Sequence, residues 1–163
     1  MRRLILLRHA KSVWDTPDAD HGRTLSPRGE RDAGRVADRL RNLGWVPDGV
    51  RSSDAARTRQ TWEHMAGRFD AEPPVEFQAF LYLAGPHEVS KVLAQTSAET
   101  ETLMLIGHNP GWEDSVAYLS GEATTLKTCS AALLEAQRDS WPELAEPSSW
   151  RLVDVVRAKE LRT

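Results

Sequence analysis

Two short runs of large aliphatic residues limit the folds that are open to this chain. Leu4–Leu7 (LILL) and Thr102–Ile106 (TLMLI) are almost entirely apolar, and each ends abruptly, the first at Arg8-His9 and the second at Gly107-His108. Short continuous apolar runs predict strands that are buried on both faces, which is typical of a parallel sheet covered by helices. We therefore expect two central strands, each followed by a histidine.

Segments with helical periodicity alternate with further short apolar segments. Ser26 suits a helix N-cap and Pro27 the first helical position, and apolar residues then recur at helical spacing up to Gly44. Helices are also expected over residues 55–69, 87–95 and 112–119, and strands over residues 47–52, 75–80, 131–136 and 150–156. This alternation predicts an α/β fold, a three-layer α/β/α sandwich with a mainly parallel central sheet.

Composition favours an ordinary globular protein. The chain has 163 residues, so we expect a single domain over residues 1–163. Charged residues make up 28% and the formal net charge is −3, which disfavours a nucleic-acid partner. No apolar run approaches the roughly 20 residues of a membrane helix, so no membrane association is expected. Cys129 is the single cysteine; we expect it in the core, and a reducing cytoplasm as the location.

The candidate site lies where the expected strands end. Ligands of open α/β sheets bind beyond the carboxyl ends of the strands. Three of the expected strands end at polar side chains, and Arg57 lies in the helix that follows the second of them. If these strands are neighbours in the sheet, four side chains meet at one mouth: Arg8, His9, Arg57 and His108.

This set of side chains suits phosphoryl transfer. A phosphoryl group carries about two negative charges near neutral pH, and the planar guanidinium of arginine matches its oxygens. A neutral histidine can attack phosphorus, and a second, protonated histidine can donate a hydrogen bond to the phosphoryl oxygens. The chain has no GxxxxGK[ST] loop and no evident set of Mg²⁺-binding carboxylates. We expect chemistry that needs neither a metal nor a cofactor, because the cationic side chains neutralise the phosphoryl group.

Four segments together resemble one known family. Residues 7–12 (LRHAKS) resemble the RHG signature of the histidine phosphatase superfamily, also called phosphoglycerate mutase-like, and the chain looks most like its SixA-type phosphohistidine phosphatases. Residues 20–29 resemble the D-x-x-R-x-L-x-x-x-G segment of the family, and residues 53–61 resemble S-x-x-x-R-x-x-Q-T. Residues 106–110 (IGHNP) resemble the strand that ends at the second catalytic histidine, and residues 128–134 a late strand. The resemblance extends from about Leu4 to Leu161.

The resemblance implies a role for each matching residue. It implies a phosphoglycerate mutase-like fold in which His9 is the nucleophile and becomes phosphohistidine. It assigns the phosphate pocket to Arg8, Arg57 and His108. Ser12 matches a hydroxyl position that can reach the same pocket, or it caps the turn after the strand. The small side chain of Ala10 is expected to let the phosphate come close.

Departures from the family pattern bear on the substrate. Ala10 stands where many relatives have glycine, and Asp15 where mutase relatives often have a phosphate-binding asparagine. The usual acidic residue of the family is a glutamate in the middle of the chain, but residues 80–85 (FLYLAG) contain no acid. A proton donor is therefore missing or comes from elsewhere, and four residues are candidates: Asp18, Asp20, His21 and Glu88.

A missing acid favours a phosphohistidine substrate. Protonated on its other ring nitrogen, phosphohistidine can release neutral imidazole, whose conjugate acid has a pKa of about 6.5, whereas an alkoxide needs a proton donor. The chain is also too short for a large lid, so an open pocket could admit a side chain of a signalling or phosphocarrier protein. The alternatives are a phosphomonoesterase for a nucleotide, sugar or cofactor phosphate, and a non-catalytic phosphate-binding module. The presence of both histidines favours an enzyme.

The remaining polar and aromatic residues carry weaker expectations. Arg23 either binds phosphate or holds its loop through carboxylates. His21 is expected at the surface. Trp14 and Trp112 follow the two candidate histidines; they are either walls of the pocket or packed in the core, which is the default for tryptophan.

Overall fold

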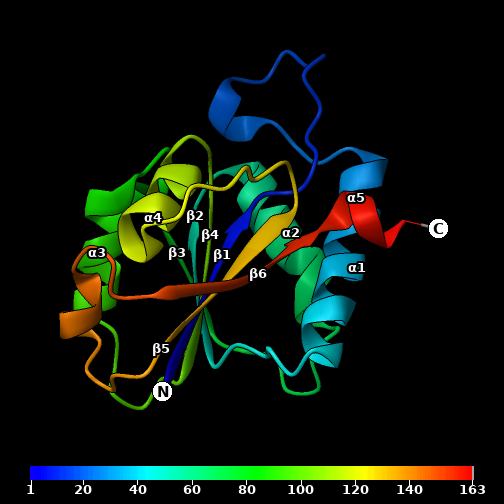
Figure 1. The fold of residues 1–163 in the computed structure, drawn as a ribbon. Helices are drawn as coiled ribbons and strands as arrows, with labels where there is room; N and C mark the ends of the chain where they lie inside the picture. Colours follow the sequence, from blue (N-terminus) through cyan, green and yellow to red (C-terminus); the bar gives the residue numbers. More distant parts are fainter. Residues whose placement is uncertain (163) are drawn as a thin grey trace.

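The computed structural model describes residues 1–162, which form a six-stranded sheet in the order β3-β2-β4-β1-β5-β6 (Figure 1). The strands are β1 (Arg2–Arg8), β2 (Gly49–Ser53), β3 (Val75–Gln78), β4 (Thr102–Gly107), β5 (Ser130–Ala136) and β6 (Arg151–Arg157). Strands β3, β2, β4 and β1 are parallel, and β5 and β6 add two antiparallel pairings at one side. The predicted α/β architecture with a mainly parallel sheet is confirmed.

Helices cover both faces of the sheet, which is why the central strands are aliphatic throughout. One face carries α1 (Pro27–Asn42), α2 (Ala56–Ala66) and the short α5 (Ala158–Leu161), and the other carries α3 (Pro86–Ala94) and α4 (Gly111–Ser120) (Figure 1). Ile5 and Leu7 pack toward the first face, while Leu4 and Leu6 pack toward the second. All four side chains are fully buried. The three layers therefore follow from the alternation of side chains along β1.

The expected elements agree with the structure to within a few residues. Ser26 caps α1, where its hydroxyl accepts a hydrogen bond from the Gly29 N–H at 3.1 Å. The helix expected over 55–69 ends earlier, at Ala66, and the loop after β1 contains one short 3-10 turn, η1 (Asp20–Gly22). Two further 3-10 turns are η2 (Ala79–Leu81) and η3 (Pro142–Ala145). Cys129 is fully buried in the core, as expected, and burial raises the pKa of its thiol.

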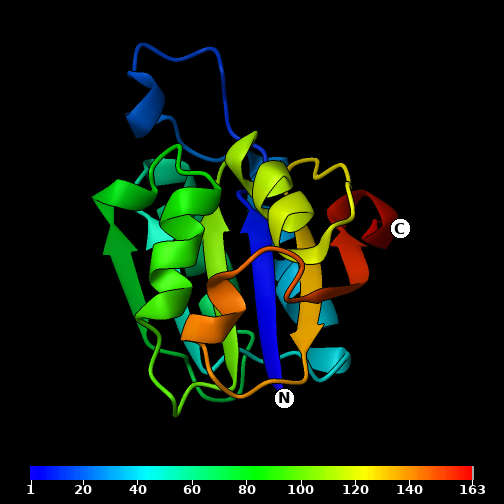
Figure 2. The same cartoon turned by 60° about the vertical axis from the view of Figure 1, so that its left-hand side comes forward.

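The carboxyl ends of β1, β2 and β4 lie at the same edge of the sheet (Figure 2). The loop of residues 14–23 projects beyond this edge. Its two ends are joined where the Val13 N–H donates to the Thr24 carbonyl at 2.9 Å. Within residues 1–162, no helix is long and apolar enough to cross a membrane.

Gly111, the first residue of α4, is packed so closely that its position tolerates no side chain. A Cβ atom added at Gly111 would lie 1.7 Å from the carbonyl oxygen of Ala84 and 2.7 Å from its carbonyl carbon. Both are backbone atoms, so Gly111→Ala is expected to lower the free energy of unfolding by roughly 3 kcal/mol. Urea denaturation measures this change. The control is Gly67→Ala, because a Cβ there meets nothing within 4 Å, and equal effects of the two substitutions would contradict the packing.

Candidate active site

The order of the strands brings the predicted site residues together. Because β1 and β4 are neighbours, His9 and His108 emerge side by side, and their ring centroids lie 5.4 Å apart. Arg57, in the first turn of α2, donates a hydrogen bond from Nε to Nε2 of His9 at 3.3 Å. A pocket of about 360 Å³ opens here, and its lining includes all five residues singled out from the sequence: Arg8, His9, Ser12, Arg57 and His108.

The hydrogen bonds of His9 leave a lone pair on Nε2. Its Nδ1 lies 2.8 Å from the carbonyl oxygen of Ala10, which can only accept, so Nδ1 carries the ring proton. The Arg57 Nε–H points at Nε2, which must then be the acceptor. Burial lowers the pKa of His9 to about 3, with smaller contributions from the nearby His108, Arg57 and Arg8. At neutral pH the ring is therefore neutral, which is the state that a nucleophile requires.

The backbone around His9 is held on both sides. The His9 N–H donates to the Gly107 carbonyl at 3.1 Å, and the His9 carbonyl accepts from Cys129 at 2.9 Å. The Ala10 N–H donates to the hydroxyl of Thr61 at 3.0 Å. The side chain of Ala10 lies in the hydrophobic core and does not line the pocket, so the expected reason for its small size is wrong.

His108 is positioned by Ser53, a contact that the sequence did not reveal. Nε2 of His108 lies 2.8 Å from Oγ of Ser53, and Oγ also accepts from the Ala55 N–H at 3.2 Å. The Ser53 hydroxyl proton is thus available for Nε2. In that arrangement the proton of His108 is on Nδ1, which is buried and has no hydrogen-bond partner within residues 1–162.

The second histidine is neutral in the unliganded site, and its protonated state in the phosphate-bound site stays a prediction. Burial, and to a smaller extent the positive charge of Arg57, lowers the pKa of His108 to about 3. A bound phosphoryl dianion would raise the pKa of His108, because an opposite charge nearby favours the charged form.

Arg8 and Arg57 supply positive charge at the pocket. Arg57 is buried, and its two Nη atoms donate to Asp20, one to the backbone carbonyl at 2.7 Å and one to the carboxylate at 3.1 Å. Arg8 donates from Nη1 to the Leu126 carbonyl at 3.1 Å. Its buried Nε–H has no partner among the described residues.

Arg23 joins the site through Ser12 and Trp14. Nη1 of Arg23 donates to the hydroxyl of Ser12 at 2.8 Å, so this hydroxyl lines the pocket and does not cap the turn. The guanidinium carbon of Arg23 lies 3.6 Å from the centroid of the Trp14 ring. Trp14 is 72% exposed and lines the pocket, so of the two expectations it is a pocket wall and not a core residue. Its ring covers a buried cation, whereas Trp112 is fully buried as expected.

Of the four candidate proton donors, Asp20 alone lines the pocket. The others have local partners: the Asp18 carboxylate accepts from Thr16, Glu88 accepts from the Gly85 N–H at the start of α3, and His21 pairs with Asp54. A hydrogen bond from the Tyr82 hydroxyl lowers the pKa of Asp20 to about 2, and Arg57 and Arg23 contribute. Asp20 is therefore ionised at neutral pH and holds no proton to donate.

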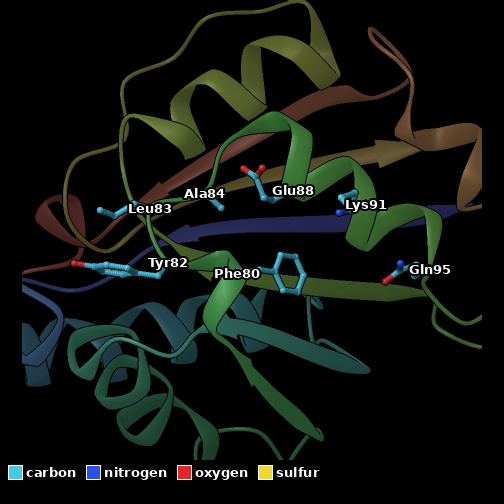
Figure 3. A pocket seen from close by; sticks show the side chains of 7 residues that line it. All are labelled: Phe80, Tyr82, Leu83, Ala84, Glu88, Lys91 and Gln95. Carbon is cyan, nitrogen blue, oxygen red and sulfur yellow. The ribbon is translucent and has the colours of Figure 1, made fainter.

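A second cavity, of about 540 Å³, lies beside the pocket and shares Leu83 with it. Figure 3 shows the side chains of Phe80, Tyr82, Leu83, Glu88 and Lys91 around it. Phe80 and Leu83 are exposed. Within residues 1–162, no three His, Cys, Asp or Glu side chains are grouped so that they could hold a metal ion.

The two buried histidines should make the fold sensitive to acid. Their native pKa values are about 3 and their ordinary value is 6.5, so between these limits the unfolded chain binds more protons than the native one. The free energy of unfolding should therefore fall as the pH is lowered through this window, by up to about 1.4 kcal/mol per pH unit for each histidine. Urea denaturation across the window measures the slope. It should be shallower in His9→Gln and His108→Gln, and slopes equal to that of the wild type would contradict the account.

Comparison with known proteins gives one family. The Histidine phosphatase superfamily (branch 1) profile matches residues 4–81, a span that includes Arg8, His9 and Arg57. An uncharacterised chloroplastic protein of Arabidopsis thaliana is 42% identical over 168 residues, which cover 95% of this chain and 77% of that protein. An uncharacterised protein of Mycobacterium tuberculosis is 34% identical over 83% of this chain and 81% of its own length.

Two solved SixA structures share the whole fold. The SixA protein of Agrobacterium tumefaciens, provisionally assigned as a phosphohistidine phosphatase, is 30% identical and has a TM-score of 0.79 over 95% of this chain and 97% of that chain. The SixA protein of Nakamurella multipartitia, with the same provisional assignment, is 28% identical and has a TM-score of 0.81 over 96% and 95%. This chain therefore belongs to the histidine phosphatase superfamily (branch 1) and has the phosphoglycerate mutase-like fold of the SixA proteins.

Proposed function

We propose that this phosphatase removes the phosphoryl group from a phosphohistidine on a signalling or phosphocarrier protein, and that it does so through a covalent intermediate on His9. The observation that carries the proposal is the neutral ring of His9, with its lone pair on Nε2 beside Arg57 and its centroid 5.4 Å from that of His108. These are the parts that a two-step transfer through histidine needs.

In the first step, Nε2 of His9 attacks phosphorus while the bond from phosphorus to the leaving group breaks. Arg8 and Arg57 neutralise the phosphoryl oxygens, and the ring of His108, which lines the same pocket, donates a hydrogen bond to one of them. In the second step, water attacks the phosphorus, and the electron pair of the P–N bond returns to Nε2. The phosphate leaves with the protons of the water, and the neutral ring of His9 is restored. Because cationic side chains balance the phosphoryl charge, we propose no metal and no cofactor.

Two observations support phosphohistidine as the substrate. The one carboxylate at the pocket within residues 1–162 is that of Asp20, which is ionised and cannot protonate an alkoxide. An imidazole that is protonated on its far nitrogen departs without such help. The two SixA proteins that are 28–30% identical to this chain carry the same assignment provisionally.

The second cavity supports a protein as the carrier of the phosphoryl group. It continues from the pocket at Leu83, which is 59% exposed, and it offers the exposed ring of Phe80 and the ammonium group of Lys91. The loop of residues 14–23 projects beyond the edge of the sheet (Figures 1 and 2), and Trp14, Asp20 and Arg23 of this loop line the pocket. A folded partner could therefore bring its own side chain to the pocket. A cytoplasmic location is part of the proposal, since cytoplasmic phosphocarriers provide such substrates.

The test is a phosphatase assay in EDTA with no added metal. It compares a histidine-phosphorylated phosphocarrier protein with p-nitrophenyl phosphate and with a panel of nucleotide, sugar and cofactor phosphates. The proposal predicts that kcat/KM is highest for the phosphoprotein. A metabolite phosphate that is turned over faster would replace it with a small-molecule phosphomonoesterase. Binding of phosphate without any turnover would indicate a binding module.

A further inference from the structure

The position of Asp20 is unexpected for a site that binds an anion. A carboxylate repels a phosphoryl dianion, yet within residues 1–162 Asp20 is the one acidic side chain that lines the pocket. Three donors hold its carboxylate in place: Arg57 at 3.1 Å, Arg23 at 3.1 Å and the hydroxyl of Tyr82. Arg57 also donates a hydrogen bond to the backbone carbonyl of Asp20 at 2.7 Å. The carboxylate is therefore fixed at the pocket by several contacts and is not a freely moving surface group.

The exposures of His9 and Asp20 place the carboxylate toward the mouth of the pocket and the nucleophile at its base. The guanidinium of Arg57 connects the two groups, since its Nε contacts Nε2 of His9 at 3.3 Å and its Nη2 contacts Asp20. His9 is only 6% exposed and lies deep, whereas the side chain of Asp20 is 44% exposed at the mouth. In an in-line transfer the leaving group is opposite the nucleophile, which here is toward the mouth.

We propose that Asp20 is a specificity-determining residue, whose carboxylate accepts a hydrogen bond from the protonated far nitrogen of a phosphohistidine ring and so selects an imidazolium leaving group over a neutral ester. This inference rests on the proposed function and adds the protonation state of the substrate to it. The pocket would thus carry cations for the phosphoryl group and one anion for the ring that leaves.

The step balances without a proton donor. The substrate ring carries phosphorus on one nitrogen and a proton on the other, so the ring is positive. The P–N bond breaks, its electron pair returns to the ring, and the new bond forms between phosphorus and Nε2 of His9. The ring leaves as neutral imidazole and keeps its proton. A nearby anion raises the pKa of the substrate ring and so increases the protonated fraction that can react.

Other charged or titratable groups also face Asp20. They are Arg57, Arg23 and Tyr82 in direct contact, His21, whose ring centroid is 4.8 Å from that of Tyr82, and His108, whose ring centroid is 5.4 Å from that of Tyr82. The two arginines and the tyrosine hydroxyl keep the carboxylate ionised at neutral pH, so its charge is constant where the substrate ring titrates. A change in the pH profile near neutrality would then report the substrate ring.

The same contacts also fix the loop of residues 14–23, so the experiment has to separate recognition from loop structure. It compares wild type, Asp20→Asn and the control Asp18→Asn, whose carboxylate is in the same loop but accepts from Thr16 away from the pocket. The substrates are a histidine-phosphorylated protein and p-nitrophenyl phosphate, each over a range of pH. p-Nitrophenolate is a good leaving group with no ring proton, so it reports the phosphoryl pocket alone.

Asp20→Asn is expected to lower kcat/KM for the phosphohistidine protein roughly 10- to 100-fold, as for the loss of one charge-assisted hydrogen bond. In the pH profile of kcat/KM for that substrate, the basic limb of Asp20→Asn should lie at lower pH than that of wild type. Activity on p-nitrophenyl phosphate should fall much less than activity on the phosphoprotein, and Asp18→Asn should match wild type on both. Equal losses on both substrates would show that Asp20 only holds the loop and would overturn the inference alone. If wild type does not turn over phosphohistidine, the proposed function fails, and the inference fails with it.

Discussion

His9→Ala is expected to lower kcat by at least about 10,000-fold on every phosphorylated substrate, because the attacking nitrogen is lost while the rest of the pocket remains. Steady-state assays on the phosphoprotein and on p-nitrophenyl phosphate measure the loss. Inorganic phosphate should still bind to His9→Ala in a calorimetric titration, since Arg8, Arg57 and His108 are retained.

The matched control is His64→Ala, which removes an exposed histidine from α2. It should leave kcat and KM near their wild-type values. A His9→Ala variant with a tenth of wild-type activity would contradict the nucleophilic role of His9. It would indicate that water attacks the phosphorus directly.

Arg57→Ala should have the second largest effect, a fall in kcat/KM of about 1,000-fold. Its guanidinium touches His9 and Asp20 at once, so its loss removes a phosphate ligand and leaves the Asp20 carboxylate beside the substrate with only one of its two arginine partners. Arg57→Lys should recover only a small part of the activity, because one ammonium group cannot reproduce contacts to both residues.

The double variant Arg57→Ala, Asp20→Asn tests that explanation. On p-nitrophenyl phosphate it should be more active than Arg57→Ala, since the negative charge of Asp20, which Arg57 no longer balances, is gone. Arg59→Ala is the control, because Arg59 lies on the same helix but stacks on Phe77 outside the pocket. If Arg59→Ala loses as much activity as Arg57→Ala, the loss reflects damage to α2 and not the removal of a phosphate ligand.

The fold could be predicted because its determinants are local. Leu4–Leu7 and the aliphatic run of β4 predict buried strands, and Ser26-Pro27 predicts the start of α1. The meeting of His9 with His108 required one further assumption, that β1 and β4 are neighbours, and the sheet order satisfies it.

The parts that sequence could not predict depend on contacts between distant residues. Asp20 meets Arg57 and Tyr82, which lie 37 and 62 positions away, and these contacts decide that it is ionised. The neutral state of His108 follows from burial and from a neighbouring cation, which no local pattern encodes. Tryptophan ordinarily packs in the core, but the ring of Trp14 is exposed and stacks on the guanidinium of Arg23, which is distant from it in the local pattern.

The covalent intermediate is the central claim, and trapping it is the most direct test. Wild-type protein would be mixed with a histidine-phosphorylated phosphocarrier, quenched in alkali within milliseconds, digested, and analysed by mass spectrometry. The account predicts a transient phosphoryl group on the peptide that contains His9, which forms and decays at rates that sustain turnover. Phosphate released at the full rate with no phosphorylated His9 at any time, or with the label on another residue, would contradict it.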